Sequence, residues 1–415
     1  MTNTRLKTNL STKERSQPEI ELLLACSRTN VSPQLAKRIK ELVQQDLDWQ
    51  CLFDLGCRHQ LIPLLYHNLS RICKDIVPAQ PLSLMQNIFA HKAQTNLFTT
   101  SELIRVCRLF AQNNIFAIPF KGMTLAMTAY QNLTFRDSCD IDILISKENF
   151  ALATKLLEDS GYETIGYIAQ VKDNPALRYG SFLQSEANQK GYDFYHPTKE
   201  IAIDLQWSVT VKTQSHYFDV DFEQFKQNAT EVELAGDKLP QFAPEMMLLY
   251  LCFHGSKHCW QSLKWVCDLA EFIGSHRDLD WQQIEQRAKQ LKAETMLHLG
   301  LLLTHNFYQT AIPESLLKTA QQNTRANSLY GQVCQLIFTR RFTQWEDYNF
   351  IFQITDSWQG KLQFLKGLLF TPTAKEWDTV QLPKSLFFLY YFIRPYRLTK
   401  EYLTAKSKSS ITNNE

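Results

Sequence analysis

The chain lacks the features that define several large classes of protein. Among its 415 residues only 13 are glycine and 14 are proline, which is few for a β-sandwich with its many tight turns. Lysine and arginine total 44 against 42 aspartates and glutamates, so the net charge of +2 provides no overall positive electrostatic field that would attract nucleic acid. We therefore expect no extended nucleic-acid template among the partners.

Targeting signals and cysteine frameworks are also lacking. The polar N-terminus has no apolar core of a signal peptide, and the longest apolar candidate, Leu386 to Ile393, is far shorter than the ~20 residues of a membrane span. The ten cysteines never form a Cys-x-x-Cys pair, which excludes a disulfide framework and a zinc ribbon. The sequence predicts a cytoplasmic protein in a reducing compartment with no membrane span.

Aromatic residues and helical periodicity are what the chain has in abundance. It contains 26 phenylalanines, 16 tyrosines and 8 tryptophans, and its hydrophobic fraction of 44% is that of a globular protein. Helical spacing dominates residues 16–113 and 236–398, whereas strand-like alternation is confined to 114–235. We expect an α+β fold in which a small mixed-sheet core is flanked by helical N- and C-terminal regions, with a disordered tail at 1–15 and a polar tail at 399–415.

Within the central region the elements follow one another closely. The pattern predicts a short strand that ends at the break Lys121-Gly122, a helix, a second strand, an amphipathic helix stopped by Gly161, and a hairpin that turns at Pro197-Thr198-Lys199. The expected ranges are strand 115–120, helix 123–130, strand 140–145, helix 147–160, a third strand over 162–168, and hairpin strands 191–196 and 201–207.

The second strand begins with two aspartates in an alternating pattern. Residues two apart on a strand project from the same face, so Asp140 and Asp142 lie side by side while Ile141 and Ile143 enter the core. Adjacent carboxylates repel unless a cation lies between them, and hard oxygen ligands suit Mg²⁺ or Mn²⁺. Asp204, flanked by apolar residues on a later strand, is a candidate for a third carboxylate if the two strands are neighbours.

An Asp-x-Asp pair alone is most often a solvated strand end, so the metal-site hypothesis depends on the residues that accompany the pair. Lys121 and the Gly122 N–H group, at a strand-to-helix junction, are suited to binding phosphate oxygens. Arg136, four residues before the first aspartate, is a candidate for a further phosphate contact. Three carboxylates that hold two metal ions serve in-line displacement at phosphorus.

These motifs occur in an order that resembles a known family. They are Phe120-Lys121-Gly122, Leu125-Ala126, Tyr130, Arg136, Asp140-Ile141-Asp142-Ile143-Leu144-Ile145 and Gly161-Tyr162. Together they resemble the uncharacterised nucleotidyltransferase family within the DNA polymerase β-like superfamily. Looser similarity extends over most of the chain.

The resemblance implies a nucleotidyltransferase fold, with Asp140 and Asp142 as metal ligands and Asp204 as the third carboxylate. It implies a Mg²⁺-dependent (or Mn²⁺-dependent) transfer of a nucleoside monophosphate from an NTP to a small-molecule or protein acceptor, with release of pyrophosphate. The wider superfamily has Gly-Ser at the start of its first helix, where this chain has Lys121-Gly122, and we expect Lys121 to replace that serine. The alternative is a non-catalytic nucleotide-binding or scaffold protein that retains the fold.

A second group of metal-binding residue types lies downstream. His254 and His258 are four residues apart, close to Asp268 and several cysteines, which is one arrangement for a zinc site. Gly255 follows His254, so the Glu of a His-Glu-x-x-His metalloprotease is missing. A stronger alternative is that His258, Lys257 and Lys264 line a substrate cleft opposite the carboxylates, and the strongest is that the imidazoles pack at a helix junction.

Near the C-terminus, Phe387 to Ile393 form an aromatic run followed by basic residues. Its helical spacing predicts a buried terminal helix rather than a membrane-binding or base-stacking segment. The basic residues predict a solvated end, with weak attraction to an anionic surface as the alternative.

Overall fold

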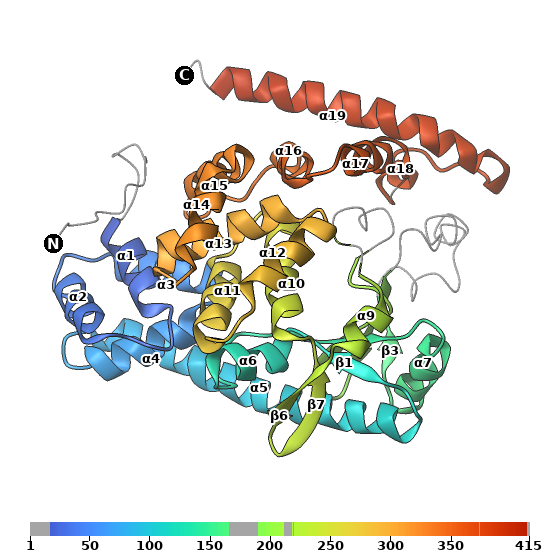
Figure 1. Ribbon diagram of the computed structural model, residues 1–415. Coiled ribbons are helices and arrows are strands. Elements are labelled where there is room, and N and C mark those ends of the chain that lie inside the picture. Colours follow the sequence, from blue (N-terminus) through green and yellow to red (C-terminus); the bar gives the residue numbers. More distant parts are fainter. Residues whose placement is uncertain (1–16, 166–189, 211–217, 219, 373, 413–415) are drawn as a thin grey trace.

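A five-stranded mixed sheet is preceded and followed by helices in the chain, and the N-terminal and C-terminal helices share one hydrophobic core (Figure 1). This arrangement is seen in a computed structural model that describes residues 17–165, 190–210, 218, 220–372 and 374–412. The predicted α+β class is confirmed. The long helix α5 (Ala79–Gln112) runs along one side of the molecule in Figure 1, and the C-terminal helices lie on the opposite side.

The sheet has the strand order β1-β2-β5-β4-β3. The parallel pair β2–β5 lies at its centre, and the other three neighbouring pairs are antiparallel. Two more strands, β6 and β7, form a separate antiparallel hairpin. The strands are β1 (Ala117–Pro119), β2 (Asp140–Ile145), β3 (Glu163–Thr164), β4 (Gly191–His196), β5 (Ile201–Gln206), β6 (Thr230–Leu234) and β7 (Asp237–Gln241).

Alternation along β2 separates its apolar and acidic side chains. Ile141, Ile143 and Ile145 are at most 2% exposed and belong to a core shared with α5 and with α7 (Phe150–Asp159). Because successive side chains of a strand point to opposite faces, Asp140 and Asp142 lie on the other face of the sheet. The isoleucine core therefore supports the acidic face from behind.

Helices before the sheet build the N-terminal region, and the series from α10 onward builds the C-terminal region. The first group is α1 (Gln17–Cys26), α2 (Pro33–Val43), α3 (Trp49–Arg58), α4 (Ile62–Ile72) and α5. Inside the central region lie α6 (Gly122–Tyr130), α7 and α9 (Phe222–Gln227). The last group is α10 (Pro244–Lys257), α11 (Leu263–Ser275), α12 (Trp281–Gln290), α13 (Glu294–Tyr308), α14 (Glu314–Gln322), α15 (Thr324–Leu336), α16 (Gln344–Ile354), α17 (Trp358–Phe370), α18 (Ala374–Thr379), the 3-10 helix η4 (Lys384–Leu389) and α19 (Tyr390–Thr412).

Most predicted elements of the central region have counterparts in the structure. The strand expected over 140–145 is β2, and the expected hairpin is β4 and β5. Of the third strand expected over 162–168, the structure shows Glu163–Thr164, and the part after 165 lies outside the described residues. The hairpin β6–β7 runs past the boundary predicted at 235, so the division into domains stays a prediction. The tail expected at 1–15 also lies outside the described residues.

The C-terminal predictions need two corrections. Helix α19 continues to Thr412, so the polar tail expected from 399 is helical over most of its length. No glycine or proline follows Pro395 to end the helix, and the lysines and alanine there favour it. The aromatic run is not a buried helix: Tyr390 is fully buried, whereas Phe388 is 55% and Phe392 is 70% exposed.

No helix that the structure describes is both long enough and apolar enough to cross a membrane.

Candidate active site

The turn between β1 and α6 has an unusual backbone. Lys121 adopts φ 61° and ψ −144°, and Gly122 adopts φ 42°, both in the region that favours glycine. A non-glycine residue there stores strain of about 1–3 kcal/mol, which is found preferentially at functional sites. A Cβ atom added to Gly122 would lie 3.4 Å from the carbonyl oxygen of Asp140, so the turn passes close to the start of β2.

The three predicted carboxylates come together on one face of the sheet. In the parallel pair β2–β5, Asp142 stands directly opposite Asp204, and Asp140 precedes Asp142 by two residues on the same face. Asp140 is exposed, whereas Asp142 is only 4% exposed. The expectation that the strand of Asp204 neighbours the strand of Asp142 is therefore met.

Two lysines neutralise the more buried carboxylates. The Nζ atom of Lys121 lies 2.5 Å from Oδ1 of Asp142, and the Nζ atom of Lys190 lies 2.9 Å from Oδ2 of Asp204. The buried amide of Gln206 donates to Asp204 and, at 3.5 Å, to Asp142. The acidic face is thus a network of three carboxylates, two ammonium groups and one amide.

Burial and mutual repulsion change the acidity of Asp142. Burial raises the pKa of this carboxyl to about 6, because Asp140 and Asp204 add to the effect and the attraction of Lys121 only partly opposes it. The raised pKa of Asp142 therefore reflects its burial first and the repulsion of the neighbouring carboxylates second.

This donor set suits a hard divalent cation. Carboxylate oxygens are the ligands of Mg²⁺ and Mn²⁺, and the three aspartates share one face of two neighbouring strands. Within the described ranges, however, no three carboxylate, imidazole or thiol groups are clustered tightly enough to hold an ion. Two of the carboxylates are bonded to lysines instead, so Lys121 and Lys190 would release them to a cation.

Two further residues of this face were not among those predicted from the sequence. Lys190 precedes β4, and Asp193 on β4 stands directly opposite Asp204. Burial raises the pKa of Asp193, and the charge of Asp204 raises it further. The signal was present in the predicted hairpin, because pairing His196 with Ile201 across the turn fixes Asp193 opposite Asp204.

The three residues predicted to line a cleft have different surroundings. Lys257, at the end of α10, is half-buried, and burial together with the charges of Lys190 and Lys121 lowers its pKa to about 8. The ring of His258 packs against Trp265, and burial of this ring together with the charges of Lys257 and Lys121 lowers its pKa to about 4, so the imidazole is neutral at pH 7. Lys264 donates to the carbonyl oxygen of Asp137 at 2.8 Å and to Gln60, and so holds the loop before β2.

Arg136 lies in the loop before β2 and is hydrogen-bonded to helix α11. Its guanidinium makes two hydrogen bonds to Asp268 on α11, of 2.9 and 3.0 Å, and a third to the carbonyl oxygen of Gly122. Tyr130 also donates to Asp268, at 2.7 Å. Because Arg136 is only 7% and Asp268 only 1% exposed, these contacts favour support of the loop over a direct phosphate contact.

The downstream histidines pack against aromatic rings. His254 lies between Tyr250 and His258, and His258 stacks on Trp265 with ring centroids 5.0 Å apart. Asp268, a zinc-ligand candidate, is already bonded to Arg136 and Tyr130. These contacts support the packing interpretation over the zinc site.

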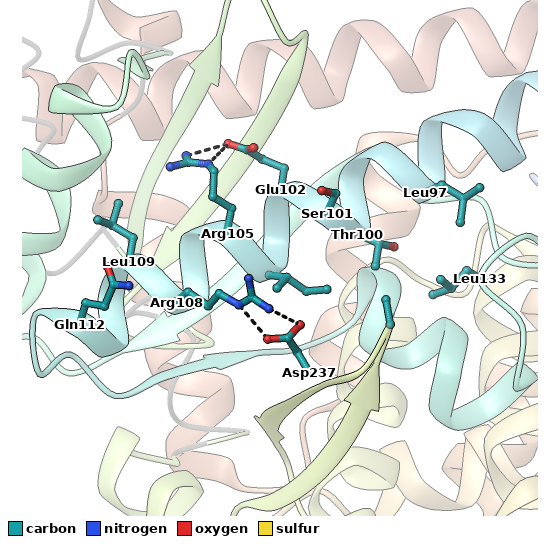
Figure 2. Close-up of a pocket in the computed structure, with 12 residues that line it drawn as sticks. Leu97, Thr100, Ser101, Glu102, Arg105, Arg108, Leu109, Gln112, Leu133 and Asp237 are labelled. Atoms are coloured by element: carbon teal, nitrogen blue, oxygen red, sulfur yellow. Dashed lines mark hydrogen bonds and ion pairs between the residues drawn. The ribbon is translucent and has the colours of Figure 1, made fainter.

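Two pockets lie away from the acidic face. One, of about 850 Å³, lies between the N-terminal region and α11, and one of about 650 Å³ lies between α5 and the β6–β7 hairpin. Figure 2 shows that the charged side chains of the second pocket pair with one another, Arg108 with Asp237 and Arg105 with Glu102. Neither pocket is lined by the acidic face.

Comparison with known proteins places the chain in a family. A search of curated proteins finds no match. Among solved structures, one likeness is to the solution structure of the antibiotic-resistance factor ANT(2'')-Ia, with 11% identity, a TM-score of 0.31, and coverage of 46% of this chain and 91% of that chain. Residues 45–309, which include the Lys121-Gly122 turn and all of the acidic face, match the model of a family described as uncharacterised nucleotidyltransferase. The resemblance inferred from the motifs is confirmed, and the chain belongs to this nucleotidyltransferase family.

Proposed function

We propose that the chain transfers a nucleoside monophosphate from an NTP to a small-molecule or protein acceptor and releases pyrophosphate. The observation that carries this proposal is the register of β2 and β5, which sets Asp142 opposite Asp204 beside Asp140. The strained Lys121-Gly122 turn next to these carboxylates offers N–H groups and an ammonium to phosphate oxygens.

In this reaction the aspartates hold the metal and the lysines bind the phosphates. Asp140, Asp142 and Asp204 would hold Mg²⁺ or Mn²⁺, which supplies charge neutralisation and lowers the pKa of a coordinated hydroxyl group. Lys121 and the Gly122 N–H group bind the β- and γ-phosphates once Lys121 leaves Asp142. Lys190 and Lys257 add positive charge to the same region.

The reaction is a substitution at the α-phosphorus. An acceptor hydroxyl, phosphate or amine attacks, its bond to phosphorus forms, and the bond to the bridging oxygen of pyrophosphate breaks. Asp204 accepts the acceptor's proton, directly or through water, when Lys190 releases it. Arg136 keeps the loop before β2 in place through Asp268.

One observation favours a second candidate, a nucleotide-binding protein without turnover. Lys121 and Lys190 already neutralise Asp142 and Asp204, as they would in a site that binds phosphates and needs no metal. This candidate predicts that an NTP binds equally well with and without Mg²⁺.

Pyrophosphate release separates the two candidates. The chain is incubated with each of the four NTPs, Mg²⁺ or Mn²⁺ and a heat-inactivated extract of small molecules and proteins as the source of acceptor, while thermal unfolding is followed in parallel samples without the extract. The transferase predicts metal-dependent release; the binder predicts a rise in melting temperature with no release. An NTP at a hundred times its Kd stabilises by about 2.7 kcal/mol in either case. No release and no stabilisation with any NTP contradicts both.

The pH dependence of turnover follows from two shifted groups. Asp142, with a pKa of about 6, is neutral below that pH and ionised above it. Lys257, with a pKa of about 8, is charged below that pH and neutral above it. The value of kcat/KM should therefore peak between pH 6 and 8 and fall by about tenfold per unit on either side.

The variant Lys257→Met assigns the alkaline limb. With this variant, kcat/KM should be lower at pH 7 and should no longer fall between pH 8 and about 9. Lys226→Met, an exposed lysine on α9, serves as the matched control and should keep the wild-type profile. An alkaline limb that persists in Lys257→Met would show that another group titrates there.

A further inference from the structure

Large apolar side chains are exposed mainly in one segment near the C-terminus. Of the 19 exposed large hydrophobic residues in the described part of the chain, 12 lie between Trp358 and Leu403. This segment lies beyond residues 45–309, so the family match does not account for it. The twelve are Trp358, Leu362, Leu369, Phe370, Val380, Leu386, Phe388, Tyr391, Phe392, Tyr396, Tyr402 and Leu403.

Two arginines of helix α19, Arg394 and Arg397, lie on the side that faces the protein. Arg397 lies 2.7 Å from Glu376 of α18, and Arg394 lies 3.5 Å from the same carboxylate, which is 0% exposed. Arg394 also donates to the carbonyl oxygen of Leu368 on α17. These buried ion pairs fix the rotation of α19 about its axis.

The opposite side of α19 is apolar and faces outward. Phe392, Tyr396 and Leu403 are spaced by four and seven residues, which places them on one stripe of a helix, and they are 70%, 72% and 60% exposed. Figure 1 shows α19 lengthwise along α16 to α18, at the edge of the molecule far from the sheet. Such a long, unpaired apolar stripe marks an interaction surface.

Charge distinguishes this segment from the rest of the chain. Residues 358–412 contain nine lysines and arginines against three aspartates and glutamates, a net charge of +6. Because the whole chain carries +2, the remaining residues carry −4. Aromatic side chains beside basic ones are typical of helices that lie in the interface of an anionic membrane.

We propose that the outer face of α19 docks on an anionic lipid surface, with its axis parallel to the membrane. No described helix can cross a bilayer, so the attachment is peripheral. A second copy of the chain is a poorer occupant, because a symmetric contact would bring two segments of charge +6 together. The inference is independent of the proposed catalysis.

Vesicle flotation tests the proposal. The full chain is mixed with vesicles of phosphatidylcholine alone or of phosphatidylcholine with phosphatidylglycerol. It should bind the mixed vesicles at least about tenfold more tightly than the neutral ones, and less tightly when salt rises from about 0.1 M to 1 M. The variant Phe392→Ser/Tyr396→Ser should lose more than about tenfold of this affinity.

A matched variant and a size measurement make the test decisive. Leu97→Ser/Phe98→Ser removes two exposed apolar side chains from α5 and should leave vesicle binding unchanged. The proposal is overturned if the chain does not bind anionic vesicles, or if both variants lose binding equally. It is also overturned if light scattering shows a dimer that Phe392→Ser/Tyr396→Ser dissociates while vesicles are not bound.

Discussion

Replacing Asp140 and Asp142 together by asparagine is expected to lower metal-dependent NTP turnover by at least about 10³-fold. The reason is that charge stabilisation by a bound metal is worth several kcal/mol in the transition state, and each 1.4 kcal/mol is a factor of ten. Asparagine has the size of aspartate, and Asp142 lies in a strand supported by the isoleucine core, so the fold should persist. The measurement is the initial rate of pyrophosphate release.

Asp237→Asn is the control for this double variant. Asp237 lies on the β6–β7 hairpin, where it pairs with Arg108 away from the acidic face, and its loss should change turnover by less than about twofold. Unchanged turnover in Asp140→Asn/Asp142→Asn would remove these carboxylates from the reaction. A single Asp193→Asn variant then reports whether the fourth carboxylate, opposite Asp204, also contributes.

The substitution Arg136→Met is expected to lower the free energy of unfolding by about 3–5 kcal/mol. It removes the cationic partner of Asp268 and leaves a carboxylate that is 1% exposed without its ion pair. Since total stability is about 5–15 kcal/mol, the loss is a large fraction of it. Urea denaturation of the wild type and the variant measures the difference.

Two further variants show whether the loss of stability comes from the unpaired buried carboxylate. Arg38→Met breaks a half-exposed pair with Glu21 near the surface and should cost no more than about 1 kcal/mol. Arg136→Met/Asp268→Leu removes both buried charges and should recover much of the lost stability. If Arg136→Met/Asp268→Leu also has the wild-type KM for the NTP, the role of Arg136 is to support the loop. If the KM of this double variant is higher than that of the wild type, Arg136 binds phosphate.

Local pattern was enough to predict the central strands and the three carboxylates. Alternation of isoleucine with aspartate identified β2 and the face that Asp140 and Asp142 share. Apolar neighbours on both sides of Asp204 identified β5, and the short turn after His196 paired it with β4. These features depend on residues close together in the chain, which is why they could be predicted.

Features that depend on distant residues could not be predicted in this way. The partner of Arg136 is Asp268, 132 residues further along the chain, and nothing local distinguishes a buried ion pair from a phosphate contact. Lys190 became part of the site only through the pairing of β4 with β5. In α19 the spacing of the aromatic residues predicted a helix but not which side faces the protein, which the pairs with Glu376 decide.

The central claim is tested most directly by comparing NTPs labelled at the α- and γ-phosphorus. The chain is incubated with Mg²⁺, either label, and a heat-inactivated extract of small molecules and proteins as the source of acceptor. We predict that the α-label enters an acceptor or the chain itself, that the γ-label leaves as pyrophosphate, and that Asp140→Asn/Asp142→Asn abolishes both. Transfer of the γ-label to an acceptor, or α-label transfer that survives this double substitution, would contradict it.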